Sequence, residues 1–194
     1  MSENCENKLA QGFLQLCGYK PKAGIDNKYF INFDDVDKEA TQLSADRTKI
    51  TTLVLKENAK IYPAEGDKQS KGSHEFKEDV YGNGYTHTDE YIIKYRGDVA
   101  KQNVQKLVDG GKVLTIYKKT DTGLNGEITY EVAGFDSGMK LKKDSLALTE
   151  NAGTQSISVA TEEGAEGTGL KTLFMTSLAA TESFIQTHLW TPTP

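Results

Sequence analysis

The chain has 194 residues, of which 37% are apolar and 26% charged, and its formal net charge is −5. A chain of this length can bury roughly 70% of its extended surface, so it needs neither disulfides nor metals to hold a core. Arg47 and Arg96 are its only arginines, and acidic and basic residues are interleaved, which argues against a nucleic-acid-binding or membrane-surface protein. The 18 glycines favour turns, and therefore a mainly β fold.

Cys5 and Cys17 are the only cysteines, and their spacing fits neither a zinc site nor a disulfide framework. We expect two reduced thiols. The first residues carry no basic, apolar leader, and no stretch is long enough to cross a bilayer, so we expect synthesis in the cytosol.

The N-terminal region predicts a short helix from Glu6 to Cys17. Leu9, Phe13, Leu16 and Cys17 fall on one helical face, and Gly18 ends the pattern. Such a short helix must bury this stripe against the domain or a neighbouring subunit.

Alternating or β-branched runs predict strands through the middle of the chain. The run 48–62 is apolar on both faces, so we expect a central strand there, followed by a long mobile hydrophilic excursion over 63–73. The predicted strands are 28–33, 48–62, 74–81 paired with 86–95 around a GNG turn, 112–119, 127–135, 139–148 and 155–161.

Two helices are predicted after the first hairpin. Asp98 is expected to cap a helix ending at Gly110, and Ser177 a C-terminal helix after a possible strand in LKTLFMT. The stretch 162–169, EEGAEGTG, is the most flexible by composition, and the final TPTP is expected to be an exposed tail.

The stretch YEVAGFDSGMKL offers the most chemical-looking motif. Ser137 precedes Lys140 by three residues, as in penicillin-recognising enzymes, but the accompanying SDN and KTG elements are missing and GFDSG is not a GxSxG elbow. We interpret Gly134 and Gly138 as a bend between strands, and we predict no catalytic residue.

Other candidate sites are weaker still. The Asp35, Asp37 and Glu39 pattern lacks the glycine and the final glutamate of a calcium loop. His87 and Asp89 would share a strand face, but a surface-polar role is favoured over metal binding. GNG and GAEGTG do not join a strand to a helix, so we expect no phosphate, metal or cofactor site.

Tyrosines form one further pattern. Tyr81, Tyr85, Tyr91 and Tyr95 cluster around the first hairpin, which would suit carbohydrate or protein binding, although tyrosine is also common in strands.

The order of elements, with YEVAGFDSGMKL and the terminal LFMTSLAATESFIQTHL, resembles virion structural proteins of tailed bacteriophages of Bacteroides-like hosts, most closely a major tail tube protein. The resemblance runs from about Lys28 over most of the chain. It implies a mainly β (α+β) subunit, an antiparallel β-sandwich or half-barrel with one flanking helix and helical N- and C-terminal segments.

The implied organisation has three parts. Residues 1–24 would be an N-terminal helical arm, 25–160 the sandwich with a long loop 56–84 and helix 98–109, and 161–194 a flexible linker, C-terminal segment and tail.

The implied function is non-enzymatic. Copies would form a ring, commonly a hexamer, that stacks with other rings and tail proteins in the virion tail, while DNA passes without specific binding. Alternatives are a head–tail joining or capsid decoration protein, or a tyrosine-faced binding module. The candidate subunit interface comprises Leu9, Phe13, Leu16, Pro63, Glu65, Asp67, Lys68, Lys71, Phe184, Ile185 and Trp190.

Overall fold

The computed structural model describes residues 9, 12–13, 17–64, 71–78, 82–150 and 153–191. Over these residues the fold is mainly β with two α-helices, as the sequence predicts, and its strands form two sheets. In spatial order the larger sheet contains β2 (Gln42–Leu43), β3 (Lys49–Thr52), β11 (Lys171–Leu173), β8 (Tyr130–Ala133), β7 (Val113–Lys119), β1 (Ile25–Asn32) and β4 (Tyr62–Pro63). The smaller sheet contains β5 (Lys71–Lys77), β6 (Gly84–Ile93), β10 (Gln155–Ala160) and β9 (Lys140–Leu146).

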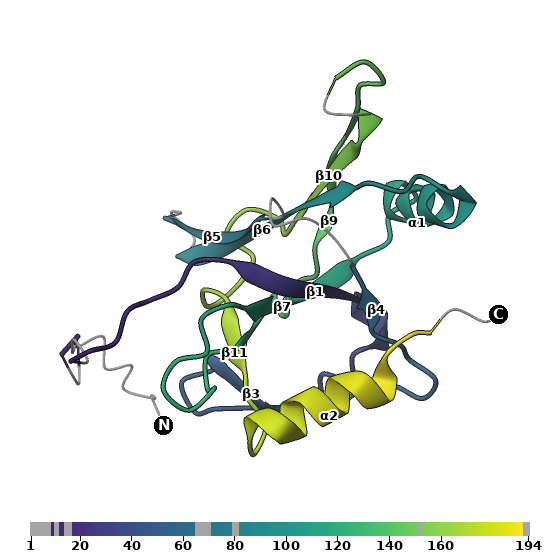
Figure 1. Cartoon of the computed structure of the whole chain (residues 1–194). Helices are drawn as coiled ribbons and strands as arrows, with labels where there is room; N and C mark the ends of the chain where they lie inside the picture. The colour runs from purple at the N-terminus through teal and green to yellow at the C-terminus, as the bar shows by residue number, and fades with distance from the viewer. Residues whose placement is uncertain are drawn as a thin grey trace.

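The molecule has three layers, with the seven-stranded sheet in the middle (Figure 1). One face of that sheet packs on α2 (Leu178–His188), and the other faces the four-stranded sheet and α1 (Asp98–Val108). Because both faces are covered, five consecutive residues of β7 from Val113 to Tyr117 are buried. Strand alternation sends Leu114 and Ile116 to the α2 side and Val113 and Tyr117 to the other side.

Both helices form where the sequence predicts them. Ser177 caps α2, because its side chain accepts a hydrogen bond from the Ala180 N–H at 3.1 Å. In α1, Gly97 rather than Asp98 occupies the N-cap position, and no side-chain capping bond forms there. A short 3-10 turn, η1 (Phe33–Asp35), follows β1.

The run 48–62 is not the central strand expected. Only β3 is regular, and it lies next to the edge of its sheet between β2 and β11. Ile50 and Leu53 are nevertheless fully buried, because the chain after β3 turns back into the α2-facing core. An apolar run therefore indicated burial here and not strand position.

The segment 56–84 is not one long loop. Tyr62–Pro63 pairs with β1, and Lys71–Lys77 pairs with β6 from Lys71↔Glu90 to Lys77↔Gly84. The first hairpin is thus confirmed, but it starts three residues before the predicted position. Residues 65–70, inside the predicted excursion, lie outside the described part of the chain.

The C-terminal third is built into the fold. β11 lies between β3 and β8, pairing parallel with the first and antiparallel with the second. The segment 162–169, expected to be flexible, is joined to β6 by a pair of backbone bonds between Tyr85 and Glu166 at 2.8 and 3.1 Å. The missing side chain of Gly84 in β6 allows this close approach, since a Cβ there would lie 2.0 Å from the Gly164 carbonyl oxygen.

Candidate functional site

The loop 134–138 between β8 and β9 is a structural bend that donates hydrogen bonds to the buried Glu166 carboxylate. Gly134 and Gly138 both have φ of +75°, which confirms the predicted bend. The backbone N–H groups of Asp136 and Ser137 each donate to Glu166 at 2.9 Å, and the Ser137 hydroxyl donates at 2.8 Å. Ser137 therefore anchors Glu166.

His87 lies against the same loop and is fully buried. Its Nδ1 accepts a hydrogen bond from the Gly134 N–H at 3.0 Å, which leaves Nε2 as the protonated nitrogen that donates to the Thr168 carbonyl at 3.0 Å. Burial lowers the pKa of His87, although Glu166 lies 3.9 Å away. The ring is thus a neutral link between three segments, which corrects the surface-polar interpretation.

Asp136 completes this inter-segment cluster. The ammonium of buried Lys171 lies 3.1 Å from its carboxylate, and the Gly167 N–H donates to it at 3.0 Å. Burial opposes ionisation, but these two donors together lower the pKa of Asp136. The cluster holds the 134–138 loop against residues 166–171.

A second polar cluster joins the two sheets. Lys28 of β1 forms an ion pair with Asp89 of β6 and donates to the Glu90 carbonyl at 2.9 Å. Both side chains are almost completely buried, which corrects the surface assignment of Asp89. Burial lowers the pKa of Lys28 and raises the pKa of Asp89, while the mutual attraction of the two charges opposes both shifts.

Neither cluster offers accessible chemistry. His87 and Asp89 share a face as expected, but they bind different partners. Among the described residues, no group of three or more histidine, cysteine, aspartate or glutamate side chains is placed to hold a metal ion. No helix within the described ranges is long and apolar enough to span a membrane.

The predicted N-terminal interface residues are only partly described. Leu9 and Phe13 are 81% and 92% exposed and belong to no helix, while most of the predicted 6–17 helix, including Leu16, lies outside the described residues. Cys17 is an exposed free thiol, and Cys5 is not described.

The other predicted interface residues do not form one surface. Ile185 is 1% exposed, so its side chain is not available to another subunit, and Phe184 is partly buried against the same α2-facing core. Pro63 is half-buried in β4, and Lys71 is exposed in β5, 3.3 Å from Glu90. Trp190 is partly exposed beside Tyr62. Glu65, Asp67 and Lys68 lie outside the described residues.

The tyrosines do not make a common binding face. Tyr85 contacts His74 and Phe76, and Tyr91 packs in the α1-facing core, so both point inward. Tyr95 lies beyond the strand and is exposed. The described tyrosines therefore do not form the exposed cluster that the alternative of a tyrosine-faced binding module requires; Tyr81 lies outside the described residues.

A hollow of about 480 Å³ lies beside Gly72 at the β5 edge. Its charged side chains are already paired, Lys71 with Glu90 at 3.3 Å and Lys119 with Glu131 at 2.9 Å. At its inner wall, the buried Tyr117 hydroxyl makes no hydrogen bond of acceptable geometry. The adjacent Asp89 and burial raise the pKa of Tyr117 well above its usual value, so it stays protonated.

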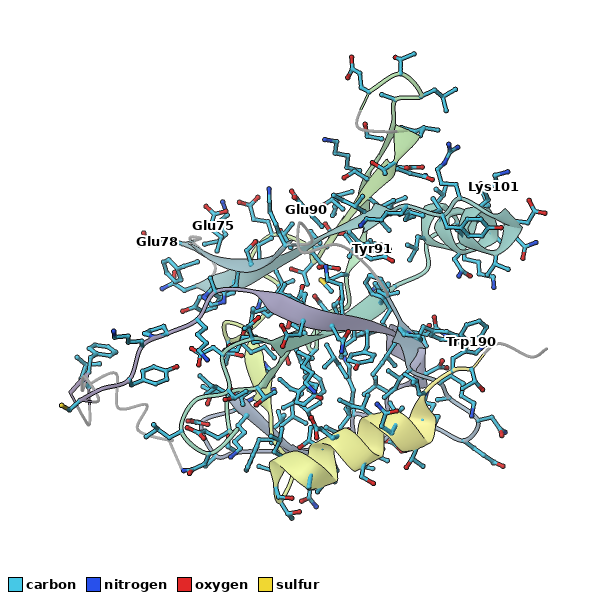
Figure 2. The ribbon with its side chains drawn as sticks, in the orientation of Figure 1. Glu75, Glu78, Glu90, Tyr91, Lys101 and Trp190 are labelled. Carbon is cyan, nitrogen blue, oxygen red and sulfur yellow. The ribbon has the colours of Figure 1, made fainter. Side chains whose placement is uncertain are left out.

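The four-stranded sheet presents a polar outer face. Glu75 and Glu90 lie on the side that points away from the larger sheet, and Tyr91 on the side toward it (Figure 2). Directly paired residues share a face, which places Thr86, Thr88, Ser73, Ser158 and Lys71 with the two glutamates.

Both edges of this sheet are open. β5 has only β6 as a strand neighbour, and β9 has only β10, within the described part of the chain. Most side chains of both edge strands are exposed. An open strand edge is a template for pairing with another chain.

Comparisons with known proteins add no relative. A scan against models of protein families, a search of curated proteins and a search of solved structures each found no match.

Proposed function

We propose that this chain is a self-assembling structural subunit of a phage virion, and that its role is that of a tail tube protein whose rings stack around a DNA channel. The observation that carries this proposal is the four-stranded sheet β5-β6-β10-β9, with its two open edges. The mainly β fold, with α1 on its flank, is consistent with it.

The strand directions favour a closed ring. All three pairings in the sheet are antiparallel, so β5 and β9 run in opposite directions. When β9 of one copy pairs with β5 of the next, the new pairing is antiparallel too, and one continuous sheet results. When the rotation between successive copies closes, repetition of this head-to-tail contact gives a ring that leaves no free edge in the sheet.

The outer face of the sheet suits a conduit for DNA. Its hydroxyl groups and interleaved charges, such as Lys71 and Glu90 at 3.3 Å, present no concentrated positive field to phosphates. Each neutralised phosphate would add a binding term and slow passage. A mixed, hydrated face therefore lets a polyanion slide.

The test is cysteine cross-linking of the edges together with imaging. In a Cys5→Ser, Cys17→Ser background, a Lys143→Cys variant is mixed with a Glu75→Cys variant and oxidised. We expect covalent dimers in the mixture, and rings or tubes of the unmodified chain by negative-stain electron microscopy.

Cysteines in the two central strands serve as the matched control. Thr88→Cys and Ser156→Cys lie in the same sheet but away from its edges, and their mixture should not cross-link. A chain that sediments as a monomer at every concentration, with no edge cross-link, would overturn the proposal.

A further inference from the structure

We propose that the buried Lys28–Asp89 pair is a site of covalent modification, at which the Lys28 amine and the Asp89 carboxyl group condense to an amide that ties the two sheets together. The bond joins side chains 61 residues apart, one in β1 of the larger sheet and one in β6 of the smaller sheet. This inference concerns the single chain and does not depend on the proposed assembly.

The two reacting groups are already held in contact. Lys28 Nζ contacts Oδ1 of the Asp89 carboxyl group, and it also donates to the Glu90 carbonyl at 2.9 Å. The second carboxyl oxygen, Oδ2, lies 3.5 Å from the Thr115 hydroxyl of β7. The amine and the carboxyl group are therefore oriented by their neighbours, and well-oriented intramolecular reactions reach effective concentrations of about 10⁵–10⁸ M.

The site excludes water, which matters because amide formation releases water. The side chains of Lys28 and Asp89 are 2% and 0% exposed. Lys28 Nζ lies 5.4 Å from the centre of the Tyr117 ring and 5.8 Å from that of the Tyr91 ring, and Tyr91 points toward the larger sheet (Figure 2). Aromatic walls around a closed pair keep bulk water from competing with the amine for the carboxyl carbon.

The protonation states also lead toward the reaction. An amine attacks only when it is deprotonated, and a carboxyl group is a better acceptor when it is protonated. Burial lowers the pKa of Lys28 and raises the pKa of Asp89, so both shifts favour transfer of the ammonium proton to the carboxylate. The attraction between the two charges opposes this transfer, so the neutral pair is a minor species and the amide accumulates slowly.

Tyr117 supplies a hydrogen-bond donor to the reacting carboxyl group. Its buried hydroxyl lies beside Asp89 and makes no well-formed hydrogen bond, and the missing side chain of Gly72 leaves room for it, since a Cβ there would lie 2.8 Å from Tyr117 Oη. As Nζ attacks, negative charge develops on a carboxyl oxygen, and a donor at that point stabilises it. Such hydrogen bonds are often poorly aligned before the reaction begins.

The step balances without any further reactant. In the neutral pair, a C–N bond forms between Lys28 Nζ and Asp89 Cγ, and the bond from Cγ to the carboxyl hydroxyl oxygen breaks. That oxygen leaves with its own proton and one proton of the amine, as a single water molecule. Tyr117 and Gly72 also line the hollow of about 480 Å³ at the β5 edge, which gives this water a route out.

The experiment follows the intact mass of the chain after folding. The full chain is purified in urea, where the two groups are apart, and is then refolded and sampled over several days by mass spectrometry. We expect the mass of the folded chain to fall by one water molecule with time, and the mass of the chain kept in urea to stay constant. Tryptic digestion of the product should yield one branched peptide that contains both Lys28 and Asp89. Chain taken directly after refolding still holds the unreacted ion pair, and it serves for measurements on that pair.

Two variants test which residues react. Lys28→Met combined with Asp89→Leu removes both groups without leaving an unpaired charge, and this variant should keep its full mass. Lys118→Met is the matched control, because it removes the lysine of the part-exposed Lys118–Glu182 pair and should lose water as the original chain does. Circular dichroism checks that each variant folds.

Two further variants exclude another route and test the donor. Succinimide formation at Asp109–Gly110 would release the same mass, so Asp109→Glu should leave the loss of water unchanged. Tyr117→Phe should slow the loss at least about tenfold, as removal of a donor to a developing oxyanion does in enzymes. An unchanged rate in Tyr117→Phe would refute the role of this hydroxyl.

A folded original chain that keeps its full mass throughout would overturn the proposal. So would a loss of water that persists in the Lys28→Met, Asp89→Leu variant. The tests of assembly are separate, because a chain that forms the amide but no ring would refute only the proposed function, and a chain that forms rings at its full mass would refute only the amide.

Discussion

The buried Lys28–Asp89 pair gives the sharpest test of how the two sheets are held together. Replacing Lys28 with methionine keeps most of the aliphatic stem and removes the ammonium. Asp89, 1% exposed, then keeps a weak hydrogen bond from the Thr115 hydroxyl at 3.5 Å and no cation to balance its charge. Breaking a buried pair in this way costs about 3–5 kcal/mol of the free energy of unfolding.

Replacing both partners should restore most of that loss. Leucine branches at Cγ as aspartate does, with methyl groups somewhat bulkier than the carboxylate oxygens, so Lys28→Met with Asp89→Leu leaves neither an unpaired charge nor a large cavity. Apolar replacement of a buried pair is often neutral or stabilising, so the double variant should unfold within about 1 kcal/mol of the original chain. The coupling energy between the two sites is therefore expected to reach about 3 kcal/mol or more.

The four chains of this double-mutant cycle are the original, the two single variants and the double variant. Urea unfolding, followed by circular dichroism at a low protein concentration, measures the free energy of unfolding of each. Lys118→Met provides the control, since Lys118 and Glu182 form a part-exposed pair at 2.8 Å whose loss should cost less than about 1 kcal/mol. If the double variant loses as much free energy of unfolding as the two single variants together, the two side chains do not depend on each other and the argument is refuted.

Three further predictions concern other buried or strained groups. Burial lowers the pKa of His87, so below about pH 6.5 the unfolded chain binds a proton that the folded chain does not. The free energy of unfolding should therefore decrease as the pH is lowered, by at most about 1.4 kcal/mol per pH unit, and less steeply in His87→Gln. Tyr117→Phe removes a buried hydroxyl without a well-formed bond, so urea unfolding should show no loss of stability. In Gly138→Ala, the alanine must adopt a φ of +75° and its Cβ would lie 2.8 Å from the Phe33 ring. Thermal unfolding should therefore show that the free energy of unfolding falls by more than about 1 kcal/mol. A Gly138→Ala chain as stable as the original would contradict the bend geometry.

Local pattern predicted the elements well because their causes are local. Alternation identified β1 and β10, and Ser177 identified the start of α2. The Gly134–Gly138 bend followed from the need for positive φ. Each of these signals lies within a few residues of the structure it specifies.

How the elements pack against one another could not be predicted from the local sequence in the same way. Glu166 sits in a glycine-rich, acidic stretch typical of a flexible linker, yet it is fully buried, because its partners come from a loop about thirty residues earlier. Ile185 was assigned to a subunit interface because its apolar face was visible in the sequence, but what covers it was not. Apolar character predicts that a side chain is covered and does not say by which chain.

The position of β11 bears on the order in which the subunit can be made and used. This strand comes after all the other described strands in the chain and lies between β3 and β8, two strands synthesised earlier. Before β11 is in place, β3 and β8 each have an unpaired edge and the core between them is incomplete. A chain without β11 would therefore keep these facing edges unpaired and the α2-facing core incomplete.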